Sequence, residues 1–138
     1  MKVLLDVNVV VDIITRRQAF YKDSYEVFNM VAEKKIIGII DACSIANVYY
    51  FARKEFSSSK LAQAAVLDLL YILLAVDTKA QDIYTAANLG FSDFEDAVIS
   101  AVAFRENADF IITRNEKDFA KSLVKAISPS DFLLHYRF

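Results

Sequence analysis

The sequence predicts an α/β fold of three layers, in which a mainly parallel central sheet of about four to five strands is flanked by helices. Short apolar runs alternate along the chain with helix-length segments, as expected of βαβ units. The first run, Val3 to Leu5, has no polar alternation, which suits a strand that is covered on both faces. A hydrophobic content of 56%, with only 2 Gly and 1 Pro, indicates an ordered chain with few loops.

The first strand ends at Asp6. Ligands of open α/β sheets bind outside the carboxyl ends of the strands, so Asp6 is a candidate site residue. Asn8 is the expected N-cap of the helix that follows, and Asp12 lies one turn further along the same face. A strand that ends in Asp is also common turn chemistry, so a purely capping role for Asp6 stays open.

Four helices and two strands are expected in the next segment. Apolar residues recur at helical spacing over residues 21–35, and the β-branched run 36–40 then predicts a strand ending at Asp41. The other expected elements are a helix capped by Ser44 and reaching about Phe56, a helix from Lys60 to about Leu73, a strand at Ala75 and Val76, and a helix opened by Thr78 and stopped by Gly90.

The last third of the chain continues the alternation. Ser92 and Glu95 have the spacing of a capping box, which predicts a helix from Asp93 to about Asn107. The elements expected after it are a strand at Phe110 to Thr113, a turn from Arg114 to Asp118, an edge strand at Val124 to Ile127, and a final helix with Ser128 as N-cap and Pro129 in its first turn.

Bulk properties narrow the class of protein. The length of 138 residues predicts a single domain, residues 1–138, with a full core. The single Cys43 cannot form an internal disulfide, and the N-terminus does not read as a signal segment, so we expect a cytoplasmic protein. The most apolar region, Leu61 to Val76, is too short to span a membrane, and no membrane association is expected.

The charge balance bears on nucleic-acid binding. A net charge of −2 argues against sequence-blind binding through a broad basic face. It does not exclude a nucleic-acid enzyme, because a local basic cluster can hold a phosphate backbone beside a metal-neutralised acidic site. The candidate pairs, each of which can also be ordinary solvated charge, are Arg16 with Arg17, Arg53 with Lys54, and Arg114 with Lys117.

Acidic and amide side chains converge on one end of the predicted sheet. They share a location at a strand end or in a first helical turn, and they are Asp6, Asp93, Asp96, Asn115 and Asp118. If the first strand neighbours the Phe110 strand, all of them face one crevice. Oxygen ligands without His or Cys suit a hard cation such as Mg²⁺ or Mn²⁺. In the other interpretation, Asp93, Glu95 and Asp96 are simply acids that favour the first turn of a helix. That effect stabilises the helix by only fractions of a kcal/mol for each acid.

Four stretches of this sequence resemble the PIN-domain ribonucleases in order and spacing. They are VLLDVNVVVD from Val3, SIANVYYFARK from Ser44, DFEDAVISAVA from Asp93, and TRNEKDF from Thr113 to Phe119. The resemblance covers essentially the whole chain and is closest to the small single-domain bacterial PIN proteins, which include VapC-type toxins of toxin–antitoxin pairs. It implies a PIN-like domain and Mg²⁺- or Mn²⁺-dependent hydrolysis of single-stranded RNA, with an antitoxin protein as an expected partner.

The resemblance also assigns roles to residues. Asp6 and Asp96 fall on the metal-binding and catalytic acids, with Asp93 as an additional ligand. Asn115 and Asp118 fall on further catalytic positions. The residues expected to bind the substrate are Asn8, Asn47, Thr113 and Arg114. The chain departs from the family at Asn47, where these nucleases usually carry Glu. A second metal position and full activity are therefore in question, whereas His135 is expected to be structural or on the surface.

Two other functions remain open from the sequence. A phosphatase could use Asp6 as its nucleophile, but such sites need a second Asp two positions on, where this chain has Asn8. A binding module for RNA or protein with a decayed site is favoured by Asn47 and Asn115. We also expect a homodimer, because the nearly all-apolar stretch Leu61 to Leu74 exceeds what one helix face needs to bury.

Overall fold

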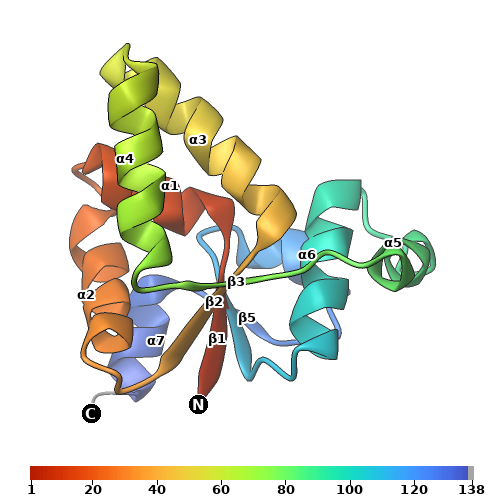
Figure 1. The fold of residues 1–138 in the computed structure, drawn as a ribbon. Coiled ribbons are helices and arrows are strands. Elements are labelled where there is room, and N and C mark those ends of the chain that lie inside the picture. Colours follow the sequence, from red (N-terminus) through yellow and green to blue (C-terminus); the bar gives the residue numbers. More distant parts are fainter. Residues whose placement is uncertain (137–138) are drawn as a thin grey trace.

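The fold is built around a parallel sheet of five strands, in the order β3-β2-β1-β4-β5 (Figure 1). A computed structural model describes residues 1–136, and all four strand pairings in it are parallel. The predicted α/β class is therefore confirmed, and the first strand does neighbour the Phe110 strand. The strands are β1 (Lys2–Leu5), β2 (Ile37–Asp41), β3 (Leu74–Val76), β4 (Phe110–Ile112) and β5 (Ala126–Ile127).

Helices cover both faces of this sheet. Val3 and Leu5 face one apolar cluster and Leu4 faces the other, as the alternation of side chains along a strand requires. The first cluster packs beneath α1, α2, α3, α4 and α7, and the second beneath α5 and α6. The helices are α1 (Val7–Thr15), α2 (Tyr21–Ala32), α3 (Ala42–Phe56), α4 (Ser59–Leu70), α5 (Ala80–Ala87), α6 (Phe94–Arg105) and α7 (Pro129–His135), with a 3₁₀ turn η1 (Glu116–Phe119).

Three helices begin at other residues than the sequence predicts, α1 and α3 earlier and α6 one residue later, and each has an Asp as its N-cap. Asp6, not Asn8, caps α1, and its side chain accepts a hydrogen bond from the Val7 N–H. Asp41, not Ser44, precedes α3, so β2 runs directly into that helix. Asp93, not Ser92, caps α6. An Asp at the end of a strand can end the strand and start the helix at once, which removes the expected loop.

Other boundaries also shift. Thr78 does not open α5, which begins at Ala80, because the Thr78 hydroxyl instead donates a hydrogen bond to the Asp41 carboxylate. The helix α4 ends at Leu70, three residues before the expected end, and Gly90 (φ +72°) lies beyond the Asn88 cap of α5. The final helix is confirmed, with Pro129 in its first turn and Ser128 accepting a hydrogen bond from the Asp131 N–H.

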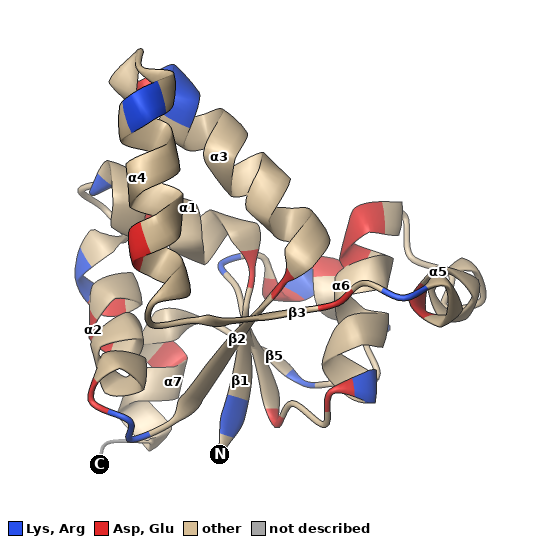
Figure 2. Cartoon of the chain, viewed as in Figure 1, with Lys and Arg blue, Asp and Glu red and all other residues tan. Residues whose placement is uncertain are grey.

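The apolar stretch from Leu61 is only partly buried. Ala62 and Leu69 of α4 pack into the core, whereas Leu61 and Leu67 are exposed. Across residues 1–136, none of the helices has both the length and the apolar character needed to cross a bilayer. Figure 2 shows that acidic residues gather where α6 begins, beside the ends of β1 and β2, while basic residues gather at the tip where α3 meets α4.

Candidate active site

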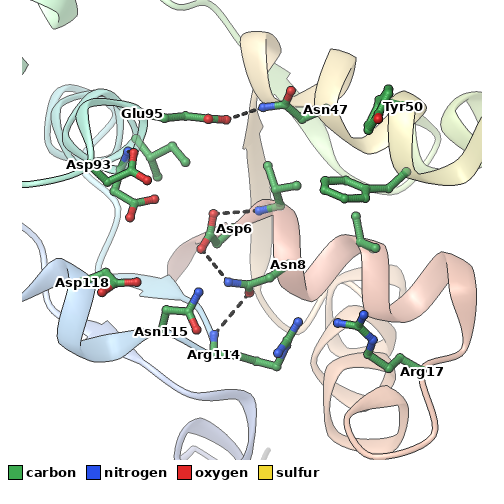
Figure 3. Close-up of a pocket in the computed structure, with 15 residues that line it drawn as sticks. Asp6, Asn8, Arg17, Asn47, Tyr50, Asp93, Glu95, Arg114, Asn115 and Asp118 are labelled. Carbon is green, nitrogen blue, oxygen red and sulfur yellow. Dashed lines mark hydrogen bonds between the residues drawn. The ribbon is translucent and has the colours of Figure 1, made fainter. Parts of the chain in front are cut away.

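A pocket of about 470 Å³ opens at the carboxyl edge of the sheet, between the ends of β1 and β4 and the helices α1, α3 and α6 (Figure 3). Nine of the predicted site residues belong to its lining or to the hydrogen bonds beneath it, as described below. The lining residues are Asp6, Val7, Asn8, Val11, Arg17, Asn47, Tyr50, Phe51, Asp93, Glu95, Asp96, Ile99, Arg114, Asn115 and Asp118.

Asp6 forms the floor of the pocket and is held by three hydrogen bonds. Its Oδ1 accepts from the Val7 N–H at 2.8 Å, and its Oδ2 accepts from Asn8 Nδ2 at 3.0 Å and from the Thr113 hydroxyl at 2.8 Å. Burial raises the pKa of Asp6, while the hydrogen bonds from Thr113 and Val7 oppose that rise. The side chain thus both caps α1 and lies at the site, so the two interpretations of Asp6 are compatible.

Asn8 and Thr113 surround Asp6 and fix its orientation. Thr113 is fully buried and does not line the pocket, so its hydroxyl supports Asp6 and is not free to touch a substrate. The Asn8 Oδ1 accepts a hydrogen bond from the Arg114 N–H at 3.2 Å, and Asn115 N–H donates to the Thr113 oxygen at 3.1 Å. This network ties the start of α1 to the segment after β4.

The acids at the start of α6 repel one another inside the pocket. Asp93 is the N-cap and accepts a hydrogen bond from the Asp96 N–H at 3.2 Å. Burial, followed by the charges of Asp6, Asp93, Asp118 and Glu95, raises the pKa of Asp96 to about 7. A side chain that resists ionisation because other carboxylates surround it is a position where a cation would be stabilising.

Glu95 is a pocket residue that the sequence did not identify. Its carboxylate accepts a hydrogen bond from Asn47 Nδ2, which joins the start of α6 to the middle of α3 across the pocket mouth (Figure 3). The two residues are 48 positions apart, so only the folded structure reveals the pair. Asn47 therefore lines the pocket, and a carboxylate stands opposite its amide.

Arg114 is fixed at the basic end of the pocket by a buried acid. Its Nε lies 2.6 Å from Oδ2 of the fully buried Asp12, in an orientation too bent for a hydrogen bond, and its guanidinium lies 4.2 Å above the Phe20 ring. Burial raises the pKa of Asp12, whereas the charge of Arg114 opposes that rise. Arg17 is 4.0 Å from the same carboxylate. The sequence placed Asp12 near Asp6 but did not predict this ion pair.

Asn115 and Asp118 complete the wall opposite α3. Asn115 precedes η1, and its carbonyl accepts a hydrogen bond from the Asp118 N–H at 3.0 Å. Both side chains are exposed and line the pocket. The turn predicted after the Phe110 strand thus aims two polar side chains at the edge where Asp6 lies. His135 is exposed at the end of α7 and takes no part in the pocket.

The donor set of the pocket fits a hard cation. It offers carboxylate and amide oxygens with no His or Cys, which is the chemistry of Mg²⁺ and Mn²⁺ sites. Among residues 1–136, no three acidic, His or Cys side chains stand close enough to form a ready-made metal cage. Mg²⁺ usually keeps several waters and needs only one or two carboxylates, so this arrangement does not conflict with its binding.

The chain is similar to known proteins over most of its length. It is 25% identical over 136 residues to Ribonuclease VapC1 of Aquifex aeolicus (strain VF5), covering 95% of this chain and 92% of the relative. Among solved structures, VapBC2 of Rickettsia felis, bound to a DNA fragment from its promoter, matches with a TM-score of 0.75 at 20% identity, over 93% of this chain and 98% of that one. VapBC-1 of nontypeable Haemophilus influenzae matches with a TM-score of 0.67 at 16% identity, over 94% and 99%.

These two structures support the fold. The family follows from the sequence itself, since the family model described as PIN domain matches residues 2–117, which span the sheet edge and every residue that lines the pocket except Asp118. The protein therefore belongs to the PIN domain family.

Proposed function

We propose that this protein is a metal-dependent endoribonuclease that hydrolyses phosphodiester bonds of single-stranded RNA. The observation that carries the proposal is the convergence of five carboxylates in one pocket, where their charges and burial raise the pKa of Asp96 to about 7. A cation would relieve that repulsion. The relative named Ribonuclease VapC1, which is 25% identical, supports the same activity.

Asp6 and Asp96 are the residues that would hold the ion, with help from Asp93 or Glu95. A bound Mg²⁺ or Mn²⁺ would polarise the phosphate and make a water more acidic. Asp6 suits this role because its three hydrogen bonds fix its carboxylate before any ion arrives. Thr113 and Asn8 then act as positioning residues, each through Asp6.

The other walls of the pocket handle the substrate. Arg114 at its basic end binds non-bridging phosphate oxygens, and Asp12 keeps the Arg114 side chain in place. On the opposite wall Asn115 orients the attacking water, and the Asp118 carboxylate accepts its proton. No His lines the pocket, so base catalysis falls to a carboxylate or to the water that the ion activates.

Asn47 sets the expected level of activity. A relative with Glu at this position would bring one more negative charge to the ions. Here Glu95 is the nearest acidic partner of that position, through its hydrogen bond with Asn47. We therefore expect weak basal activity, better with Mn²⁺ than with Mg²⁺.

The biological setting that we propose is a toxin–antitoxin pair in the cytoplasm. The support is the likeness to VapBC structures, with TM-scores of 0.75 and 0.67, and the antitoxin would be a separate protein that binds this chain. A homodimer stays a prediction, supported by the exposed Leu61, Leu67 and Tyr71 on and beside α4. Light scattering at high micromolar concentration would show a monomer if this prediction were wrong.

A second candidate function is a PIN-domain module that binds RNA or protein without cleaving it. Asn47 favours it, because one carboxylate expected in an active pocket is an amide here. One assay separates the candidates: a labelled single-stranded RNA, its duplex and a simple phosphate ester are each incubated with Mg²⁺, Mn²⁺ or EDTA. Cleavage of the single strand only with a metal supports the nuclease. Binding without cleavage supports the module, and ester hydrolysis alone supports a phosphatase.

A further inference from the structure

The pocket has an aromatic wall that the cleavage chemistry does not use. Tyr50 and Phe51 of α3 line the pocket with residue exposures of 61% and 44%, and their ring centroids lie 5.6 Å apart at an interplanar angle of 73°. In Figure 3 Tyr50 lies beyond Asn47 on the same helix, on the side of the pocket away from Asp118. The two rings thus form a corner in the wall of the pocket that the acids also line.

The core does not account for these rings. The buried residues of α3 are Ser44, Val48 and Ala52, which recur at intervals of four and form the face packed on the fold. Tyr50 and Phe51 follow Asn47 by three and four positions, so they share its face, which is directed at the pocket. Two aromatic side chains left this exposed forgo part of the stabilisation that full burial would give. An apolar ligand in the pocket would recover part of that stabilisation.

The basic end of the pocket offers a phosphate contact on the same side of the pocket as Tyr50 (Figure 3). Asp12 and Phe20 hold Arg114, which the proposed function assigns to the reacting phosphate. Arg17, with 57% of its side chain exposed, is a second cation, 4.0 Å from Asp12. Its guanidinium keeps donors that can reach a phosphate. In such a pocket the aromatic rings can stack on the base of a nucleotide, while the arginine binds its phosphate.

We propose that Tyr50, Phe51 and Arg17 form a nucleotide subsite beside the acidic centre. The base next to the scissile phosphodiester stacks on the Tyr50–Phe51 corner, and the phosphate of that nucleotide binds Arg17. The inference rests on the proposed function, because it deepens the account of how RNA lies in the same pocket. It also supplies a physical reason for a preference for single strands, since a base must leave its own stack before it can stack on protein.

The experiment measures binding apart from cleavage. Single-stranded RNA that carries one 2-aminopurine is titrated with the Asp96→Asn protein in Mg²⁺, and stacking is read from the quenching of the base fluorescence. In this background Tyr50→Ala and Phe51→Ala should each raise the Kd by roughly 5- to 100-fold and reduce the quenching. Tyr50→Phe keeps the ring and should bind as before. Tyr84→Ala is the matched control, because Tyr84 is an exposed helical tyrosine (74%) that does not line the pocket.

The wild-type enzyme gives a second readout. Tyr50→Ala should raise KM far more than it lowers kcat, because the stacked base lies beside the reacting bond and not at it. Arg17→Gln should weaken binding and reduce its dependence on salt concentration.

Several results would overturn the subsite. Unchanged Kd and quenching in both alanine variants would do so, and would assign the exposed rings to a protein partner instead. Equal weakening by Tyr50→Phe and Tyr50→Ala would show that the hydroxyl matters and the ring does not. A failure of the proposed function looks different, because the wild-type protein would then cleave no RNA with any metal. The fluorescence quenching by the variants measures binding alone, so it would still test the subsite.

Discussion

The hydroxyl of Thr113 lies 2.8 Å from the carboxylate of Asp6, although the two residues are 107 positions apart. The contact exists because β1 and β4 are parallel neighbours that end at the same edge, with Leu5 paired to Ile112. A residue directly after one strand therefore supports the pocket carboxylate directly after the other. This pair links the sheet order to the chemistry of the pocket.

Replacing Thr113 tests that link. Thr113→Val removes the hydroxyl at nearly constant size, so Asp6 loses one of three hydrogen bonds and its pKa should rise further. We expect cleavage to fall by about 10- to 100-fold, the usual effect of losing a residue that orients a metal ligand. Thr15→Val is the control, because its hydroxyl donates to the Val11 carbonyl within α1 and does not contact the acids. Equal activity of the two variants would contradict the positioning role.

The Asn47–Glu95 hydrogen bond leads to a prediction about metal affinity. Asn47→Glu adds a carboxylate beside Glu95, where its negative charge would attract a divalent ion. Desolvation of the new charge offsets much of the Coulomb energy, so we expect Mn²⁺ to bind at least about tenfold more tightly. Glu95→Gln should weaken binding instead. Isothermal titration of the three proteins measures this. Equal affinities would mean that neither side chain faces the ion.

The Asp12–Arg114 ion pair predicts a stability effect that one further substitution should reverse. Arg114→Ala leaves the fully buried Asp12 without its nearest cation, which should lower the free energy of unfolding by about 3–5 kcal/mol at pH 8. The double variant with Asp12→Asn should recover much of that loss, because no buried charge remains. Denaturant titration of the four proteins of this cycle measures the coupling. Additive effects would show that the two side chains do not interact.

The raised pKa of Asp96 predicts how stability depends on pH. Between about pH 4 and pH 7 the folded protein keeps a proton that the unfolded chain has released, so its stability falls as the pH rises through this window. Asp96→Asn removes this dependence and, after allowance for partial exposure, should stabilise the metal-free protein by roughly 1–3 kcal/mol at pH 8. Unfolding in EDTA from pH 4.5 to 8 measures the difference from wild type. A constant difference across that range would contradict the assigned pKa.

The fold was largely predictable from the sequence because its strands are continuous apolar runs. Val3 to Leu5 and Phe110 to Ile112 lack polar alternation, and both form strands buried in the middle of the sheet. The helix starts were less predictable. Asp6 and Asp41 each end a strand and begin a helix, whereas propensity alone favours a short loop and a cap further along the chain.

The site was only partly predictable, for a physical reason. Acids at strand ends could be assigned, because parallel strands end at one edge. Glu95 and Tyr50 could not, since each reaches the pocket because the fold places α3 opposite the start of α6, which no local pattern encodes. The spacing of Tyr50 and Phe51 from Asn47 was a usable indication, once Asn47 had been placed at the site.

The most direct test of the central claim is metal-dependent cleavage of a labelled single-stranded RNA by wild-type, Asp6→Asn and Asp96→Asn proteins. Asp68→Asn is the control, because Asp68 is exposed on α4 and does not line the pocket. Circular dichroism verifies that each variant is folded. We expect cleavage by wild type and by Asp68→Asn only with Mn²⁺ or Mg²⁺. In Asp6→Asn and Asp96→Asn we expect cleavage to fall by at least about 100-fold, because losing a direct metal ligand should cost no less than losing a residue that orients one. Cleavage that survives in EDTA, or in both folded variants, would contradict the account.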